Sequence, residues 1–203
     1  MKILIACEYS GRVRDAFIKQ GHDAISCDLL PSETAGPHYQ GDVRDLLTER
    51  FDMMIAHPPC TDLAVSGAAW FAKKRADGSQ QKSIEFFMML VNAKIPRICI
   101  ENPIGIMSTV YRKPSQIIQP WMFGHPESKA TCLWIKGMPL LRETNNVYDE
   151  MMQLPKNKRM RLHYLPPSKD RWKIRSETFQ GIADAMASQW GIAYDTHPIS
   201  TIT

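Results

Sequence analysis

Several features that are absent from the sequence rule out whole classes of protein and leave a compact single domain. No apolar run approaches the length of about 20 residues that a membrane-spanning helix needs, which excludes an integral membrane protein. At 203 residues there is no room for a multidomain machine, and no internal repeat is visible. The hydrophobic share of 44% and the charged share of 23% are typical of a globular protein.

The cysteines lack the paired spacing of a disulfide framework or a zinc site. There are five of them, at positions 7, 27, 60, 99 and 132. We therefore expect no metal and a reducing, intracellular setting. The opening residues Met1 to Cys7 lack the apolar length of a secretion signal, and Glu8 follows at once, so a first β-strand is expected there.

What the sequence does contain is an alternation of strands and helices. Ile3 to Ala6 and Asp23 to Asp28 predict two strands, and Val13, Phe17 and Ile18 suit one face of a helix that ends at Gly21. Further on, the sequence predicts strands over 51–56 and 97–101, a surface loop over 73–82, and helices over 83–91 and 179–190. This order predicts an α/β fold with a doubly wound, mostly parallel sheet.

Two chemically distinctive stretches follow predicted strands. His57-Pro58-Pro59-Cys60 ends one strand, and Glu101 ends the next. Ligands gather at the carboxyl ends of parallel strands, and successive strands are often neighbours, so Cys60 and Glu101 are predicted to face one crevice. A lone cysteine is more often a small buried residue of the core. The two prolines, however, would hold this thiol in a rigid loop, where it could react as a thiolate. His57 either influences the pKa of Cys60 or merely ends the strand.

The first strand, loop and helix have two features that bind nucleotide-like cofactors in such folds. Gly11 would let the backbone approach a cofactor, and Asp28, at the end of the second strand, could accept hydrogen bonds from ribose hydroxyls. The alternative is structural, since only one glycine is present and Asp28 could cap a turn.

Positive charge is concentrated near the end of the chain. Residues 156–175 hold eight Lys or Arg against one acid, a local net of +7, whereas the rest of the chain has 17 basic and 20 acidic residues. This contrast indicates either a surface that faces a polyanion or a solvated basic loop.

Pro58-Pro59-Cys60 followed by Glu101-Asn102 resembles the paired catalytic motifs of the cytosine-C5 methyltransferases. The resemblance implies a Rossmann-like, S-adenosylmethionine-dependent methyltransferase fold, with Cys60 as nucleophile and Glu101 as the carboxylate that assists it. Ala6 to Gly11 resembles the first cofactor loop, although Cys7 and Tyr9 stand where a Phe and a Gly are expected. The cofactor-binding residues that the resemblance implies are Glu8, Tyr9, Ser10, Gly11, Asp28, Asp42 and Pro58.

Phe123 to Thr131 resembles the family stretch Phe-Gly-x-Pro-Gln-x-Arg-x-Arg, with Glu127, Lys129 and Thr131 in place of the Gln and the two Arg. Lys129 lacks the planar fork of Arg, so it could fill the role of contacting the target base only partly. Phe179 to Trp190 stands where the last cofactor motif is expected.

The resemblance divides the chain into a catalytic core over 1–140, a basic segment over 141–176 that replaces a larger target-recognition domain, and a terminal part over 177–203 whose helix packs back on the core. Short methyltransferase-like proteins of phages and prophages have this size, which implies the cytoplasm of a bacterial or phage-infected cell. The residues expected to contact substrate or nucleic acid are Asn102, Lys129, Lys158, Arg159, Arg161, Arg171 and Lys173.

The function implied by the resemblance is methyl transfer from S-adenosylmethionine to C5 of cytosine in double- or single-stranded DNA, through a covalent bond between Cys60 and C6. Tyr164 and Trp172 would be available to stack on bases. The stretch 61–82 would close over the target base, or it is a polar excursion with two aromatic residues packed inward. A catalytically idle nucleic-acid-binding or regulatory homologue, and the same chemistry on RNA or free nucleotides, remain as alternatives.

Overall fold

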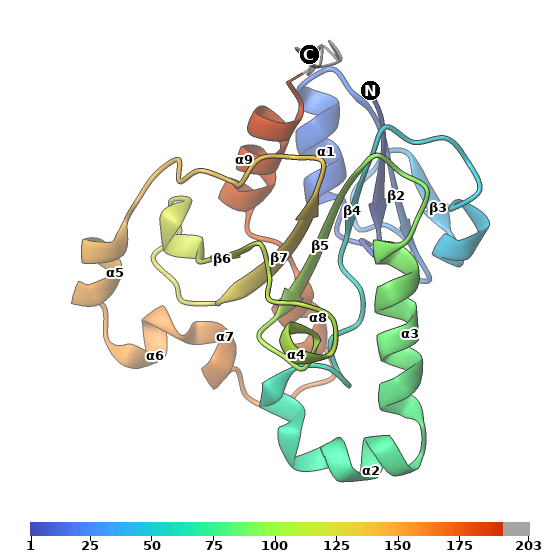
Figure 1. Cartoon of the computed structure of the whole chain (residues 1–203). Helices are drawn as coiled ribbons and strands as arrows, with labels where there is room; N and C mark the ends of the chain where they lie inside the picture. Colours follow the sequence, from blue (N-terminus) through green and yellow to red (C-terminus); the bar gives the residue numbers. More distant parts are fainter. Residues whose placement is uncertain (193–203) are drawn as a thin grey trace, which may run out of the picture.

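The computed structural model describes residues 1–192 and contains one seven-stranded sheet with helices on both faces (Figure 1). The strand order is β3-β2-β1-β4-β5-β7-β6. All pairs from β3 to β5 are parallel, whereas β7 is antiparallel to both of its neighbours. The predicted α/β fold with a doubly wound, mostly parallel sheet is therefore confirmed. The strands are β1 (Lys2–Ala6), β2 (Asp23–Asp28), β3 (His38–Gln40), β4 (Met53–Ala56), β5 (Arg97–Pro103), β6 (Gln116–Ile118) and β7 (Thr131–Lys136).

The central strands are apolar on both faces because helices cover both sides of the sheet. Ile3 and Ile5 of β1 pack into one core cluster, whereas Leu4 and Ala6 pack into the other, as the alternation of a β-strand requires. Figure 1 shows α1 (Arg12–Lys19) and α9 (Gln180–Trp190) side by side on one face and α3 (Ser79–Val91) on the other. The predicted strands and the helices at 13–21, 83–91 and 179–190 are confirmed, with small differences at their ends.

The predicted surface loop over 73–82 is wrong. This stretch follows the 3-10 helix η2 (Val65–Trp70) and contains α2 (Phe71–Ala76) and the start of α3. Its Lys, Arg and Ala residues are strong helix formers, and the stretch is polar because the helix is exposed. Gly78, with a φ of 76°, makes the turn between the two helices.

The strand order reverses between β1 and β4. β2 and β3 lie on one side of β1, and β4 and β5 lie on the other. In open α/β sheets the crevice beyond the carboxyl ends of two such strands is where ligands bind. The loops after β1 and β4, which begin at Cys7 and His57, therefore border the expected ligand site.

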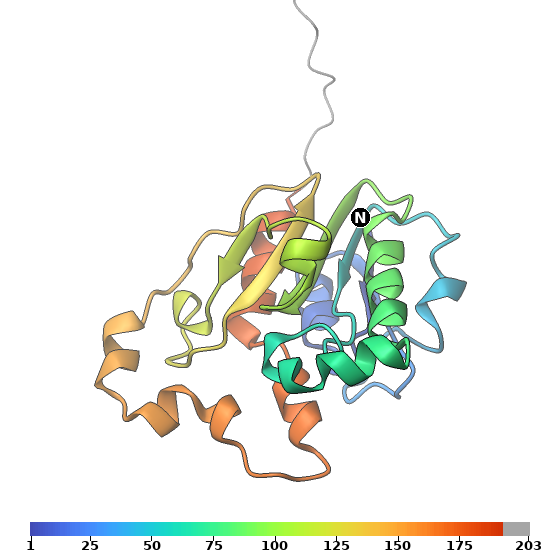
Figure 2. The ribbon, with the colours of Figure 1, turned by 60° about the horizontal axis from the view of Figure 1, so that its bottom comes forward.

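The segment 141–176 leaves the sheet after β7 and returns to the carboxyl edge through short helices. Figures 1 and 2 show this arm passing from α5 through α6 and α7 to α8, which lies below the sheet ends in Figure 1. No helix within residues 1–192 is long and apolar enough to cross a membrane. Of the expected terminal part over 177–203, residues 193–203 lie outside the described residues. The remaining elements are η1 (Val43–Asp45), α4 (Met107–Val110), η3 (Pro120–Met122), α5 (Tyr148–Gln153), α6 (Lys156–Arg159), α7 (Arg161–Tyr164) and α8 (Arg171–Ser176).

Candidate active site

Cys60 and Glu101 lie at the carboxyl ends of two adjacent parallel strands. Ala56 of β4 is paired with Ile100 of β5, so the loop that starts at His57 leaves the sheet beside Glu101. The charge of Glu101 acts on the Cys60 thiol, which shows that the two side chains share one electrostatic environment. The structure thus brings together the two residues that the sequence placed at one crevice.

Hydrogen bonds fix the loop that holds the thiol. Asn102 is buried, and its Nδ2 donates to the carbonyl of Pro58 at 2.9 Å. The amides of Leu63 and Ala64 donate to the carbonyl of Cys60 at 3.0 and 2.9 Å. Asn102 was expected to contact nucleic acid, but its position favours holding the cysteine loop in place.

The same loop is tied to the segment that follows Glu101. The amide of Ile106 donates to Leu63 and the amide of Val65 donates to Ile104. A Cβ at Gly105 would lie 2.3 Å from the carbonyl oxygen of Leu63, so only glycine allows this approach. The Cys60 loop, residues 57–65, and the segment that follows Glu101 are therefore tied to each other by backbone contacts.

The thiol of Cys60 is protonated in its resting environment. Burial raises the pKa of Cys60 and the charge of Glu101 raises it further, whereas Lys129 and Arg175 oppose this rise. Arg175 comes from α8, and sequence reasoning missed it because only the fold brings that helix near the cysteine loop. A partner that neutralises Glu101 would make the thiolate easier to form.

Glu101 has the opposite tendency. Burial by itself would raise the pKa of Glu101, but the hydrogen bond from His57, the charges of His57 and Lys129, and the Thr131 hydroxyl together lower it. The carboxylate therefore rests in its ionised form.

His57 is a direct partner of that carboxylate. Its Nδ1 lies 3.1 Å from Oε2 of Glu101, and its side chain is only 9% exposed. The other ring nitrogen, Nε2, is buried and has no hydrogen-bond partner among residues 1–192.

Lys129 links Cys60 and Glu101 to the segment that follows the arm. Its charge acts on both Cys60 and Glu101, and its Nζ donates to the carbonyl of Glu177 at 3.1 Å. The backbone amide of Lys129 also donates to the side-chain oxygen of Gln119, which fixes the position of Lys129 further. The structure thus brings Lys129 near both Cys60 and Glu101, and its contact with a substrate stays a prediction.

The loop after β1 is organised by Glu8. Its buried carboxylate accepts the amides of Val13 at 2.7 Å and Arg14 at 3.3 Å, and the Ser10 hydroxyl at 3.2 Å. Glu8 therefore occupies the amino end of α1, where backbone donors would otherwise be open to a ligand. Cys7 has a φ of 58°, a conformation that costs a residue with a side chain, and among residues 1–192 glycines alone share it.

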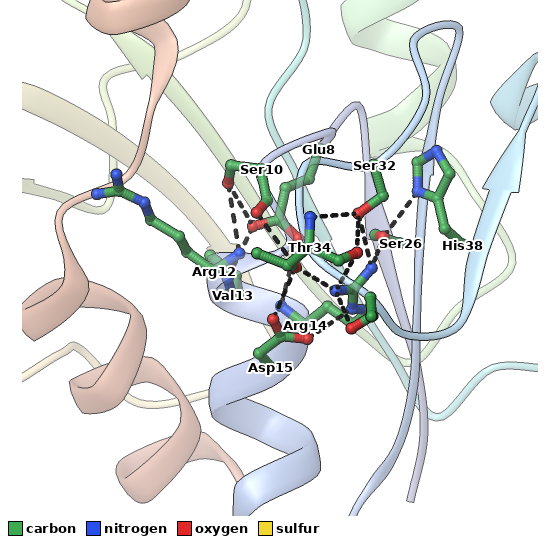
Figure 3. Close-up of polar contacts among 11 residues, drawn as sticks. Glu8, Ser10, Arg12, Val13, Arg14, Asp15, Ser26, Ser32, Thr34 and His38 are labelled. Atoms are coloured by element: carbon green, nitrogen blue, oxygen red, sulfur yellow. Dashed lines mark hydrogen bonds and ion pairs between the residues drawn. The ribbon is translucent and has the colours of Figure 1, made fainter.

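Arg14 ties this loop to the one that follows β2 (Figure 3). Its guanidinium is completely buried and donates to Ser26, Ser32, Thr34 and the carbonyl of Ala35. A Cβ at Gly11 would lie 2.1 Å from Thr34 Oγ1. The side chain of Thr34 thus occupies the space beside Gly11, so this space does not give a cofactor access to the backbone.

Asp28 and Asp42 approach one point beside the end of β1. The pKa of Cys7 is raised chiefly by burial, and after it by both of these carboxylates, so both lie near this thiol. The amide of Gly41 donates to the carbonyl of Asp28 at 2.9 Å, which brings the two loops together. Asp42 is fixed by the amide and guanidinium of Arg44. These two expected cofactor residues are brought together in the structure.

Tyr9 connects the loop after β1 to α8. Its hydroxyl contacts the carbonyl of Lys173 at 2.9 Å and the hydroxyl of Ser176 at 3.0 Å. Its ring lies against the ring of Trp172, with 6.1 Å between centroids. The end of the basic arm is therefore attached directly to the expected cofactor loop.

The expected nucleic-acid contacts are divided between paired and exposed side chains. Lys173 forms an ion pair with Glu33 at 2.6 Å, and Arg161 forms one with Glu127 at 3.0 Å. Arg171 donates to the carbonyls of Leu165 and His163, and Arg159 approaches the sulfur of Met152. Lys158 is exposed, as are Tyr164 and Trp172.

Within residues 1–192 no group of three or more His, Cys, Asp or Glu side chains is placed to hold a metal ion.

No protein-family model and no curated protein matches the chain. Among solved structures, it is similar to a prophage-encoded E. coli protein that bears the description DNA modification methyltransferase, at 16% identity and a TM-score of 0.45, over 76% of this chain and 55% of that one. It is also similar to the Dnmt2 methyltransferase of S. pombe, at 16% identity and a TM-score of 0.37, over 95% of this chain and 66% of that one. The chain thus spans between about half and two thirds of the length of these structures.

Proposed function

We propose that the protein is a DNA methyltransferase that transfers a methyl group from S-adenosylmethionine to C5 of cytosine. The observation that carries this proposal is the position of Cys60 and Glu101 on adjacent strand ends, in one electrostatic environment. A thiol beside a carboxylate at this edge has the two groups that addition to a pyrimidine ring needs. The motifs Pro58-Pro59-Cys60 and Glu101-Asn102 resemble those of enzymes that use this chemistry.

The residues around the end of β1 fit the nucleoside half of the cofactor. Asp28 and Asp42 lie close together there, and carboxylates suit the ribose hydroxyls and the adenine amino group. Tyr9 and Ser10 lie in the loop that follows β1, and Pro58 lies in the loop that follows β4. Glu8 and Gly11 mainly stabilise the conformation of the loop after β1. The carboxylate of Glu8 accepts backbone amides of α1, and the space beside Gly11 is occupied by another part of the chain. When bound, S-adenosylmethionine would supply an electrophilic methyl group.

In this mechanism Cys60 loses its proton and its sulfur adds to C6 of cytosine. Lys129 and Arg175 favour the thiolate, and Glu101, once it carries a proton, donates it to N3 and so stabilises the negative charge that develops on the ring. The adduct makes C5 nucleophilic, so that C5 can accept the methyl group. A water molecule takes the C5 proton, and departure of the Cys60 thiolate then restores the aromatic ring.

DNA is the proposed partner of the basic arm. A base inside a duplex must leave the stack to reach Cys60, which costs a few kcal/mol that backbone contacts partly offset. Lys158 and the aromatic residues Tyr164 and Trp172 are exposed on the arm and available for such contacts. We assign residues 1–140 to the catalytic core, 141–176 to this arm and 177–203 to the terminal part. An arm this short would read few bases.

One observation favours an idle homologue as the second candidate. Glu8 takes the backbone donors at the start of α1, so the carboxylate end of S-adenosylmethionine would have to be held by other groups. A protein that kept the fold without the cofactor would bind nucleic acid without modifying it. The same chemistry on RNA or a free nucleotide is the third candidate.

These candidates are separated by one assay. The protein is incubated with isotopically labelled S-adenosylmethionine and DNA, RNA or dCMP, and the methylated nucleosides are identified by mass spectrometry. We expect 5-methylcytosine from DNA with the wild type and none with Cys60→Ala. Cys132→Ala is the matched control, since it removes a buried thiol from the neighbouring strand β7.

A second readout follows the covalent step. DNA that contains 5-fluorocytosine should trap a stable adduct with the wild type, because fluorine at C5 cannot leave as a proton does. Absence of 5-methylcytosine on every substrate would overturn the enzymatic proposal. A product that survives Cys60→Ala would overturn the mechanism.

A further inference from the structure

His57 is a largely buried titratable group that contacts Glu101 directly, and neither the motifs nor the mechanism above assigns it a role. It leaves β4 two residues before Pro59 and meets Glu101 across the β4–β5 pair. The 3.1 Å contact joins Nδ1 to Oε2, and the two side chains are 9% and 16% exposed. Because both side chains are largely shielded from water, solvent weakens this contact much less than it weakens an ion pair on the surface.

The proposed chemistry requires a proton that Glu101 does not hold at rest. N3 of neutral cytosine has a lone pair and no hydrogen, so a carboxylate cannot donate to it. Burial alone would keep the carboxyl protonated, but His57, Lys129 and Thr131 lower the pKa of Glu101. The group that must stabilise N3 is thus prepared in its anionic form.

We propose that His57 is a positioning residue that orients Glu101 and shares one proton with it, so that Glu101 can protonate N3 as Cys60 adds to C6. This inference rests on the proposed function. It is specific to this chain, because it follows from the contact of His57 with Glu101 and not from the cysteine and glutamate motifs.

The electrons and protons of this step balance. The sulfur of Cys60 forms a bond to C6, the C5–C6 π pair moves to C4–C5, and the C4–N3 π pair moves to N3. The shared proton passes from Nδ1 of His57 to Glu101 and from Glu101 to N3, which leaves the ring of His57 neutral and Glu101 ionised. When the thiolate leaves, the same proton returns from N3 through Glu101 to the ring of His57.

The second ring nitrogen supports this role. A histidine that only ended a strand would have both ring nitrogens satisfied or in water, whereas Nε2 of His57 is buried with no partner among residues 1–192. A protonated ring places a hydrogen on this atom, and a polar group of the substrate can accept it. Substrate binding would then favour the charged ring, which is the form that can give up a proton.

The other groups that act on this pair come from several elements. Lys129 and the hydroxyl of Thr131 act on Glu101 directly and lower its pKa. The thiols that feel the charge of Glu101 are Cys60 of the loop after β4, Cys99 of β5 and Cys132 of β7, and Arg175 of α8 acts on Cys60.

The test compares His57→Asn with the wild type. Asparagine can still donate to Glu101 but cannot give up a proton to it. We expect kcat for methyl transfer to fall about 10- to 100-fold, with KM for DNA almost unchanged, and the pH profile of kcat to lose the limb that the shared proton contributes. His57→Gln is a second variant in case His57→Asn folds poorly, and His22→Asn is the control, because His22 precedes β2 at the opposite edge of the sheet.

A readout without methyl transfer is the rate of Cys60 alkylation by iodoacetamide as a function of pH. The wild type should show two inflections, one from the thiol and one from the shared proton, and His57→Asn should show only the first. A His57→Asn enzyme with wild-type profiles in both assays would overturn the inference and leave the proposed function intact. A wild type that methylates neither DNA, RNA nor dCMP would overturn the proposed function, and the alkylation profiles would then decide whether the proton is shared.

Discussion

Replacement of Arg14 by methionine should destabilise the protein more than any other single change of a charged residue near the candidate cofactor site. Methionine keeps the length and packing of the side chain but removes the guanidinium. That group is 0% exposed and donates to Asp15 at 2.7 Å, to Ser26 at 3.1 Å and to Ser32 at 3.0 Å. It also reaches the Thr34 hydroxyl at 2.5 Å and the carbonyls of Thr34 and Ala35 at 3.3 and 3.2 Å.

The expected magnitude follows from these six contacts. A hydrogen bond contributes about 0.5–1.5 kcal/mol net, so that six would contribute about 3–9 kcal/mol. Desolvation of the guanidinium offsets part of this gain, and the acceptors near the surface can bind water in the variant. We therefore expect the free energy of unfolding to fall by about 4 kcal/mol, with a decrease in Tm of about 8–16 °C for a chain of this size.

Urea and thermal unfolding followed by circular dichroism measure this change. The matched control is Arg12→Met, because Arg12 lies two residues away and its side chain is 40% exposed in an ion pair with Glu177. It should cost less than about 1 kcal/mol. An Arg14→Met variant within 1 kcal/mol of the wild type would refute the reasoning, since it would mean that desolvation cancels the whole network.

Three further predictions concern the loop that holds Cys60, the segment after Glu101, and the loop after β1. Because burial and Glu101 raise the pKa of Cys60, its alkylation rate should continue to increase at pH values where an ordinary thiol has already levelled off, and Lys129→Gln should move this profile to still higher pH. Gly105→Ala should destabilise the protein by about 1–3 kcal/mol in urea unfolding and lower the yield of the 5-fluorocytosine adduct, since its Cβ would lie 2.3 Å from the Leu63 carbonyl oxygen. Tyr9→Phe should make α8 more susceptible to limited proteolysis at little cost in Tm, because it removes one hydroxyl that contacts α8 twice and keeps the ring; an unchanged cleavage pattern would contradict this account.

Four of the seven strands, β1, β2, β4 and β5, could be predicted because they carry local signals, whereas β3, β6 and β7 were not predicted. The second strand has the predicted bounds, Asp23–Asp28, since an apolar stretch there lies between Gly21 and Pro31. The approach of Cys60 and Glu101 followed from one further rule, that successive parallel strands are often neighbours. The loop predicted over 73–82 failed for an equally local reason, because polarity alone does not distinguish an exposed helix from a loop.

The contacts that the sequence could not reveal join residues far apart in the chain. Tyr9 meets Lys173 across 164 positions, and the pairing of Lys173 with Glu33 depends on the path of the whole arm. A count of charges in residues 156–175 treats every cation as available to a polyanion. The structure divides them, because Arg161 and Lys173 neutralise acidic partners within the chain, whereas Lys158 remains exposed. The paired cations attach the arm to the core, and the exposed ones alone would contribute to the salt dependence of the proposed DNA binding.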